Sequence, residues 1–530
     1  MRRKTEIRII VLAGIFFVLF VGLCFNYYRI AMKREHVQTA RTNAQFTVIA
    51  GKSEGTVYDR NLKPIVNAGR KHIAVAIPTF LDRDSVAEYA TDKDDFLEKF
   101  DKGQPFTFEC KEDTPDSDGL TVFEIPERYA ENQPAQHVIG YLSQGEGVAG
   151  IEYAYNKVLR NDYGENSVTY NTDGFGQILI GDGKKIIRST AEKSGVVTTI
   201  DIDIQKICEE AGKNIDKGAI VVADVKTGEI LAMASFPTYS VDDMENALSD
   251  ERSPLINRAL YSYSVGSVFK LVTSAQAIMN HFGGYVYNCT GQEDIEGKIF
   301  NCHKTDGHGM QNLSEAITNS CNTYFINLSR ILNVKKFREL AYNLGFGREI
   351  HLCSGMTASG GVLPTVEDLM IPAELANFSF GQGKLSATPL QITQLTCAIA
   401  NNGKMPVLKL IKGMTPDGKD VLNEKNPQHS EVLERSVAKQ LREMMISAVA
   451  DNENSNARTS YTTVGAKTST AQTGRTDKNG EELCHAWITG FFPADKPQYA
   501  VTVLVEDGGY GNDVSAPVFR EIADRVSQEK

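Results

Sequence analysis

One uncharged apolar segment near the N-terminus constrains the chain more than any other feature. Residues Ile9 to Phe25 carry no charge, and the run extends to Tyr28. At about 1.5 Å per residue, about twenty helical residues cross the roughly 30 Å hydrocarbon layer of a bilayer. We therefore expect a membrane-spanning helix at residues 9–28, preceded by a cytoplasmic N-terminus at residues 1–8.

A cleaved signal peptide is the alternative to this anchor. No Ala-x-Ala-like cleavage site follows the apolar run, whereas Tyr27, Tyr28 and Arg29 are typical of an interfacial anchor. The excess of basic residues before the segment is small, but no second span follows that would return the large C-terminal part across the membrane. We expect an uncleaved anchor, with the bulk of the chain outside the cytoplasm.

Length and composition indicate a mostly folded, water-soluble chain beyond the anchor. The 530 residues are 42% apolar and 23% charged, as in an average globular protein, and they are enough for several compact units. Lys and Arg number 56 against 67 Asp and Glu, which gives a net charge of −11, and no dense basic run occurs. Nucleic acid is therefore not expected as a partner.

The pattern of apolar and β-branched residues changes near residue 196. Residues 29–195 begin with a polar stretch at 33–43, predicted to be a helical stalk, and then mix short apolar runs with acidic loops, which favours an α+β module. From Val196, β-branched runs predict strands at 219–225 and 230–235, followed by helices at 269–279, 313–318 and 389–400 and by strands at 486–492 and 499–505. Strands at both ends of a helical middle predict an α/β sandwich at 196–530 in which the two ends pair in one sheet.

The strongest local motif is Gly266-Ser267-Val268-Phe269-Lys270, at the start of an apolar helical run. Ser267 and Lys270 share one face of a helix, so the lysine nitrogen reaches the serine hydroxyl. A serine becomes a good nucleophile when a base takes its proton, and a lysine serves as that base where burial or nearby cations lower its pKa. Alone, the pattern is more typical of a helix N-terminus with an exposed lysine.

Two later motifs make the first motif a more specific signal. Ser320-Cys321-Asn322 follows a predicted helix, where a short polar loop fits between helices, although alone it is a common helix-capping turn. Lys467-Thr468-Ser469-Thr470 opens a predicted strand that continues to Gln472, although alone it is typical of a cationic edge strand.

In this order the motifs resemble the Ser-x-x-Lys, Ser-x-Asn and Lys-Thr-Gly triad of the penicillin-interacting serine transferases and β-lactamases. Other segments resemble landmarks of the class B penicillin-binding proteins, which are single-pass peptidoglycan transpeptidases. These segments are Gly55 to Asn61, Gly150-Ile151-Glu152, Thr199-Ile200-Asp201, Ala232 to Ser235, Phe380 to Gly383 and Thr388 to Gln391. The resemblance covers nearly the whole chain.

The resemblance implies a fold and a domain order. It implies an α/β penicillin-binding domain of the serine β-lactamase and transpeptidase type, with an antiparallel sheet flanked by helices. This transpeptidase domain would occupy residues 196–530. A single transmembrane helix at 9–28 and a stalk with an N-terminal pedestal of the dimerisation type at 29–195 would precede it.

The resemblance also implies residue roles. Ser267 would attack the carbonyl of the penultimate D-Ala of a stem peptide, with Lys270 as general base. Ser320 and Asn322 would relay the proton and orient the peptide, while Lys467 and Thr468 would hold the substrate carboxylate. The backbone N–H groups of Ser267 and Thr470 would form the oxyanion hole. Ser469 and Gln472 complete the predicted substrate-binding strand.

Ser469 departs from the family pattern, which usually has glycine there. Strand glycines beside a ligand often mark a close backbone approach. The serine either faces away from the ligand or narrows the site and weakens β-lactam acylation. We expect a working site, because every group with a direct chemical role is present.

The nine cysteines are too few for a disulfide scaffold. Cys289 and Cys302 flank a predicted hairpin at 291–300; an oxidising exterior would close them into a disulfide, and a reducing one would leave thiols. A zinc site made of Cys289, Cys302, His303 and His308 lacks a paired Cys-x-x-Cys spacing. We therefore expect no metal and no other cofactor.

The resemblance implies a penicillin-inhibited peptidoglycan D,D-transpeptidase in a bacterial cell membrane. Its partners would be stem peptides ending in D-Ala-D-Ala, β-lactams and a glycosyltransferase of the SEDS family. One alternative enzyme is a β-lactamase or D,D-carboxypeptidase, which gives the same acyl group to water. Another alternative is a weakly active or inactive penicillin-binding scaffold or sensor.

Overall fold

The computed structural model describes residues 2–32, 45–160, 164–173, 175–179, 183–424 and 426–529. The chain divides into two compact units that alternate along the sequence. Unit 1 comprises Met1–Glu54, Arg70–Pro126 and Tyr163–Ala191, and unit 2 comprises Gly55–Gly69, Glu127–Asp162 and Glu192–Lys530. The stalk helix predicted at 33–43 lies outside the described residues.

Helix α1 (Arg2–Ala31) contains the apolar segment predicted to span a membrane. Its apolar side chains are exposed along the whole segment, and by length and composition it is able to cross a bilayer. Among the described residues it is the one helix with these properties.

The rest of unit 1 is an α+β module, as predicted. One sheet has the order β1 (Gln45–Ser53), β8 (Gly164–Asn171) and β9 (Lys184–Ile187), and a second has the order β4 (Phe106–Cys110), β3 (Gly69–Ala76) and β5 (Leu120–Glu127). Helices α3 (Arg83–Ala87) and α4 (Lys93–Asp101) belong to the same unit. Phe96, which has no exposed surface, packs from α4 into a small core with Phe108 of β4.

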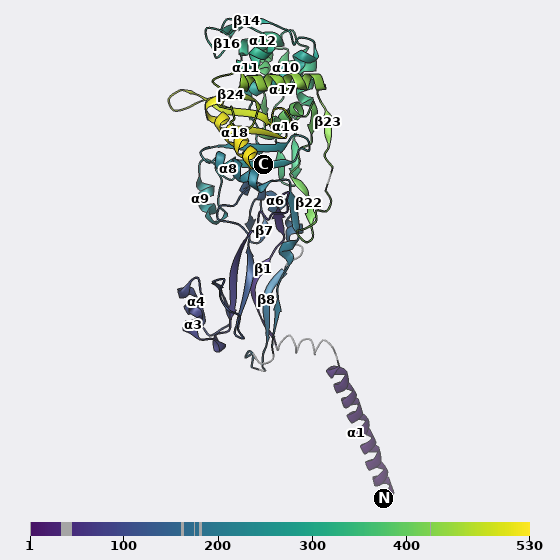
Figure 1. Cartoon of the computed structure of the whole chain (residues 1–530). Helices are drawn as coiled ribbons and strands as arrows, with labels where there is room; N and C mark the ends of the chain where they lie inside the picture. The colour runs from purple at the N-terminus through teal and green to yellow at the C-terminus, as the bar shows by residue number, and fades with distance from the viewer. Residues whose placement is uncertain are drawn as a thin grey trace. The chain divides into compact units, whose positions relative to one another are not determined.

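A five-stranded antiparallel sheet forms the centre of unit 2 (Figure 1). Its order is β12 (Ile230–Phe236), β11 (Gly218–Asp224), β26 (Tyr499–Val505), β25 (Glu482–Phe492) and β24 (Gly465–Thr476). The first strands of the predicted sandwich therefore pair with the last one, because Gly218 of β11 lies opposite Val505 of β26. This pairing confirms the predicted arrangement of the two ends.

Both faces of this sheet are covered. On β11, Ile220 and Val222 point into a core shared with α8 (Ile202–Ala211) and α18 (Gly511–Gln528), while Ala219 and Val221 point into the larger core. Alternate residues of a strand face opposite sides, so a strand buried on both sides is apolar throughout. The larger core surrounds α16 (Pro389–Ala400), every residue of which is buried.

The helical middle of unit 2 carries the first two sequence motifs. Helices α10, α11, α12 and α17 gather with the short strands β14 and β16 at one end of the unit (Figure 1). The helices of this middle region are α10 (Lys270–Met279), α11 (Leu313–Thr318), α12 (Asn322–Ser329), α13 (Val334–Asn343), α15 (Pro372–Ser379) and α17 (Arg435–Ala450). Its short strands include β14 (Tyr287–Cys289), β15 (Gln292–Ile295), β16 (Lys298–Asn301) and β17 (Gly309–Gln311). The hairpin predicted at 291–300 is the antiparallel pair β15 and β16.

Segments from the first third of the chain complete unit 2. Strand β2 (Thr56–Tyr58) pairs in parallel with β10 (Gly195–Thr198), which pairs in turn with β22 (Ile411–Thr415). In α6 (Gly150–Ala154), the fully buried Glu152 forms ion pairs with Arg128 at 2.6 Å and with Arg160 at 3.0 Å. The segments at 55–61 and 150–152 that resemble family landmarks thus lie in unit 2.

Candidate active site

The first motif lies on a short 3-10 turn, Gly266–Phe269, that leads into α10. Ser267 is partly exposed on this turn. Gly266 has φ +62° and donates its N–H to the carbonyl of Gly381 at 2.8 Å. A side chain at Gly266 would lie 2.4 Å from the Ser469 hydroxyl, so the turn, the 380–383 segment and the third motif approach one another closely.

Lys270 is fully buried, and its amine joins the first motif to the second. Its Nζ donates to the Ser320 carbonyl at 2.6 Å, to the Ser320 hydroxyl at 3.2 Å and to Asn322 Oδ1 at 2.7 Å. The same atom lies 5.6 Å from the centre of the Phe325 ring. Burial, followed by the nearby charge of Lys467, holds the pKa of Lys270 well below its ordinary value.

The second motif occupies the turn between α11 and α12. Ser320 has φ +51°, a conformation that costs a non-glycine residue about 1–2 kcal/mol and that often occurs at functional sites. Cys321 is the N-cap of α12, and Asn322 is its first residue. This turn directs the carbonyl and hydroxyl of Ser320 toward Lys270.

The third motif lies on the edge strand β24. Lys467 is buried, and its Nζ donates to the Ser320 hydroxyl at 3.1 Å and to the Thr468 carbonyl at 2.9 Å. Burial lowers the pKa of Lys467 to about 8. Ser320 therefore accepts hydrogen bonds from both lysines, and the five predicted catalytic residues lie on three adjoining segments.

The predicted substrate-binding residues alternate along β24. The buried Ser469 donates its hydroxyl to the carbonyl of Val265 at 2.9 Å, so this group is engaged with the backbone beside Ser267. Thr468 and Thr470 are partly exposed, and the Thr470 hydroxyl accepts from Gly511 N–H at 3.2 Å. Gln472 is exposed and donates to Glu482 of β25 at 2.6 Å.

This arrangement joins Lys270, Ser320, Asn322 and Lys467 in one hydrogen-bond network next to the turn that bears Ser267. Among the described contacts, the Lys270 amine donates to the second motif and not to Ser267. A hydrogen bond between a base and its nucleophile often tightens only when substrate binds. A lysine whose pKa is lowered by burial, close in sequence to a partly exposed serine, is suited to acyl transfer.

Sequence reasoning missed one residue of this region. The sequence indicated Cys321 only as the middle residue of the Ser-x-Asn motif. In the structure its sulfur lies close to the sulfurs of Cys289 and Cys302 and to the His308 ring. His303 is exposed and lies outside this group. The cysteine and histidine content of residues 289–321 was the available signal.

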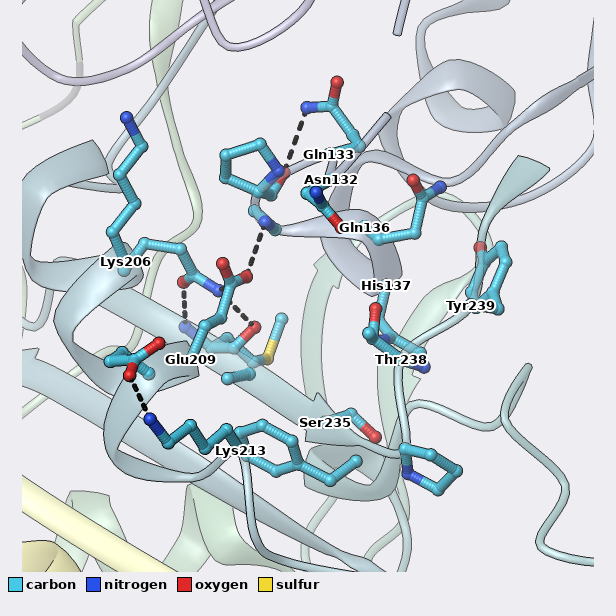
Figure 2. Close-up of a pocket in the computed structure, with 18 of the residues that line it drawn as sticks. Asn132, Gln133, Gln136, His137, Lys206, Glu209, Lys213, Ser235, Thr238 and Tyr239 are labelled. Atoms are coloured by element: carbon cyan, nitrogen blue, oxygen red, sulfur yellow. Dashed lines mark hydrogen bonds and ion pairs between the residues drawn. The ribbon is translucent and has the colours of Figure 1, made fainter. Parts of the chain in front are cut away.

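A cavity of about 1030 Å³ lies elsewhere in unit 2, with Gln136, Glu209, Ser235 and Tyr239 among its walls (Figure 2). Glu209 accepts from Ala135 N–H and from the Gln205 side chain, both at 2.8 Å, and burial raises the pKa of Glu209. None of the predicted catalytic or substrate-binding residues lines this cavity.

The chain is similar to known proteins over most of its length. Residues 218–524 match the family described as the penicillin binding protein transpeptidase domain. Stage V sporulation protein D of Bacillus subtilis is 30% identical over 408 residues, 73% of this chain and 61% of that protein. Peptidoglycan D,D-transpeptidase MrdA of Acinetobacter baumannii is 27% identical over 420 residues, 70% of this chain and 60% of that protein. The chain thus spans about three fifths of the length of these two relatives.

Solved structures share the fold. The D,D-transpeptidase domain of a peptidoglycan glycosyltransferase from Eggerthella lenta superposes with a TM-score of 0.62 at 27% identity, covering 77% of this chain and 93% of that one. Penicillin-binding protein PBP2 from Helicobacter pylori reaches a TM-score of 0.67 at 22% identity, covering 92% and 99%. The sheet, its covering helices and the three motifs therefore define a penicillin-binding transpeptidase fold. The chain belongs to the penicillin-binding protein transpeptidase family, and within it to class B.

Proposed function

We propose that this chain is a peptidoglycan D,D-transpeptidase that cross-links stem peptides through a serine acyl-enzyme and is inhibited by penicillin. One observation carries the proposal. The buried Lys270 amine bonds to Ser320 and Asn322, and the same Ser320 hydroxyl accepts from Lys467. The three motifs thus meet at the Ser320 hydroxyl, which accepts from both lysines, and the pKa of Lys270 is lowered next to the turn that bears Ser267.

Acylation follows from this geometry. The Ser267 hydroxyl attacks the penultimate D-Ala carbonyl while neutral Lys270 takes its proton. The N–H groups of Ser267 and Thr470 would stabilise the oxyanion, with each such donor contributing about 3 kcal/mol. The proton then passes through Ser320 to the departing D-Ala amine, which leaves the acyl-enzyme.

The other cationic group has a separate role. Protonated Lys467, with Thr468 on the same strand, would bind the substrate's C-terminal carboxylate, and penicillin carries an equivalent carboxylate. Asn322 would hold the peptide while its Oδ1 keeps Lys270 in place. Ser469, held on Val265, would shape the turn beneath the nucleophile rather than contact the peptide.

The second half-reaction distinguishes this function from its alternatives. In a transpeptidase, an amine of a neighbouring stem peptide attacks the acyl-enzyme and restores the Ser267 hydroxyl. A carboxypeptidase or β-lactamase gives the acyl group to water, and a scaffold would form no turnover product.

Location and partners form part of the proposal. The apolar helix α1 is compatible with a membrane anchor, and we propose that its N-terminus is cytoplasmic and that residues 29–195 form the pedestal. A membrane glycosyltransferase of the SEDS family would supply the glycan strands. PBP2 of Helicobacter pylori has been solved in complex with MreC, so a protein similar to MreC is a further candidate partner.

Intact-protein mass tests the proposal. The full chain in detergent is incubated with benzylpenicillin, beside a Ser267→Ala variant and a Ser262→Ala control from the same region. We expect one adduct in the parent and the control and none in Ser267→Ala. Rapid loss of penicillin without a lasting adduct would indicate a β-lactamase, whereas intact penicillin without an adduct would favour the scaffold. A peptide donor with an added amine acceptor then separates cross-linking from hydrolysis.

A further inference from the structure

Side chains of the central sheet hold the short segment that leads to the predicted nucleophile. We call residues 263–265 the approach segment, because the 3-10 turn that bears the serine follows them directly. The Ser264 carbonyl accepts a hydrogen bond from Trp487 Nε1 at 3.0 Å, and the Val265 carbonyl accepts one from the Ser469 hydroxyl at 2.9 Å. Two successive carbonyls just before the turn are therefore fixed by side chains.

Both donors lie on one face of the sheet. Ser469 of β24 is directly opposite Trp487 of β25, so their side chains are neighbours on the same face. Both residues are buried, and Trp487 has no exposed surface. The next pair on this face is Ala471 with His485, and a side chain on Gly266 would lie 3.0 Å from the Ala471 side chain. The approach segment and the start of the turn thus pack on this face of β24 and β25.

Tyr263 attaches the approach segment to a buried ion pair. Its hydroxyl donates to Glu506 Oε1 at 2.8 Å, and Arg258 Nε donates to the same oxygen at 2.8 Å. Burial, followed by the charge of Glu506, raises the pKa of the Tyr263 hydroxyl, which therefore remains a donor. The Tyr263 ring makes edge contacts with His485 and Trp487, with ring centres 5.3 Å and 6.3 Å apart. Tyr263 and Trp487 thus form one connected support.

The position of the nucleophile depends on this backbone. No described residue forms a hydrogen bond with the Ser267 hydroxyl, so the segment before it sets where the hydroxyl lies. We propose that Trp487 and Tyr263 are positioning residues for acylation: they fix the approach segment on the sheet and so place the Ser267 hydroxyl and N–H for reaction. This inference rests on the proposed function, in which Ser267 supplies both the nucleophile and an oxyanion donor.

Packing alone is the other role that a buried tryptophan commonly has. A buried indole N–H usually finds some acceptor, so the bond by itself does not distinguish the two roles. The acceptor here, however, is the carbonyl three residues before Ser267, and the next carbonyl is bound from the same face. Loss of packing lowers the melting temperature, whereas loss of positioning lowers the rate of the chemical step without weakening the first binding of penicillin.

An analogue of tryptophan separates these roles. The chain has one tryptophan, so replacing tryptophan by benzothienylalanine during expression changes position 487 alone. This analogue keeps the shape of the double ring but has sulfur in place of N–H. The full chain in detergent is acylated over a range of benzylpenicillin concentrations. We expect the rate constant at saturation to fall about fivefold or more, because a nucleophile displaced by about 1 Å can lose about a hundredfold in rate. The dissociation constant of the initial complex should change less than about twofold.

Variants test the second residue. Tyr263→Phe removes the bond to Glu506 and should lower the saturated rate constant about threefold or more. Tyr58→Phe is the matched control, because the Tyr58 hydroxyl donates to the Lys193 carbonyl at 3.0 Å, outside the three motifs. Phe491→Leu removes a fully buried ring from β25 and controls for packing. Both controls should keep the saturated rate constant of the parent, and Phe491→Leu should lower the melting temperature.

The outcomes separate this inference from the function on which it rests. A parent that forms no adduct would refute the proposed function and the positioning role with it. An acylated parent whose benzothienylalanine form reacts at the same saturated rate would refute the positioning role alone. A weaker initial complex at an unchanged saturated rate, or an equal loss of rate in Tyr58→Phe and Phe491→Leu, would also overturn it.

Discussion

The pH dependence of acylation should report the ionisation of Lys467. Its pKa is lowered to about 8 by burial, and it must be protonated to bind a carboxylate. Acylation by benzylpenicillin should therefore weaken as pH rises through about 8. In the proposed mechanism Lys270 acts as the neutral base, and its pKa is also lowered, so its protonation at acid pH should weaken acylation as well. The second-order rate constant should follow a bell-shaped profile.

The size of the alkaline limb follows from that pKa. With a pKa of about 8, Lys467 is about nine-tenths protonated at pH 7 and about one-tenth protonated at pH 9, so the rate constant should fall roughly tenfold between them. Lys467→Met removes the charge at all pH values. Loss of a charge-assisted hydrogen bond of about 1.5–3 kcal/mol should slow acylation roughly 10- to 100-fold near neutral pH. The alkaline limb should then disappear.

Stopped-flow or gel-based trapping with a fluorescent penicillin measures this constant at low ligand concentration, where the free enzyme is reported. Lys496→Met is a control of the same chemical change outside the three motifs. Thermal unfolding at each pH would separate a loss of chemistry from a loss of fold. A constant that stays level from pH 7 to above 9 in the parent, or an alkaline limb that persists in Lys467→Met, would refute the role given to Lys467.

Three further outcomes follow from named contacts. Ser469→Gly loses the hydrogen bond to the Val265 carbonyl and gains backbone freedom, so it should destabilise the chain by about 1–2.5 kcal/mol in denaturant titrations. The acylation rate should change less than tenfold. A large gain in the acylation rate would mean that the serine narrows the site. Asn322→Ala removes a hydrogen-bond acceptor of the buried Lys270 amine, so labelling by fluorescent penicillin should slow roughly 10- to 100-fold with little change in melting temperature. An unaltered labelling rate would contradict the hydrogen-bond network around Lys270. Glu152→Gln leaves the buried Arg160 and the half-buried Arg128 without their charge partner and should cost about 3–5 kcal/mol, whereas Glu98→Gln on the surface should cost under about 1 kcal/mol. Equal losses would argue against the buried charge cluster.

Much of the fold was predictable because burial leaves a clear pattern. The apolar run at 219–225 and the later one at 499–505 are hydrophobic on both faces, which marks strands covered on both sides. The helix at 389–400 was equally clear, with Thr388 and Gln391 forming its capping box. The alternation of the two units was not predictable, because no composition change marks a short strand such as β2 that pairs with residues more than a hundred positions away.

The site was predictable as motifs but not as contacts. The order of Ser267, Ser320 and Lys467 indicated the chemistry, yet the sequence could not show that Ser469 turns its hydroxyl to a backbone carbonyl. Nor could it show the grouping of Cys321 with His308, because that depends on how two short strand pairs fold over the turn.

The alternation of the two units also governs the order in which the chain can fold as it is synthesised. Strand β2 emerges early, but its partner β10 follows only after most of unit 1, and β22 after a further two hundred residues or so. Contacts of such long range form slowly and leave early segments exposed. Unit 1 can complete itself while unit 2 waits, so a fragment beginning at residue 196 would lack pieces that its own sheet and buried ion pairs require. Unit 2 should therefore be the last part of the chain to fold, because its central sheet stays unfinished until its last strand, β26, is available.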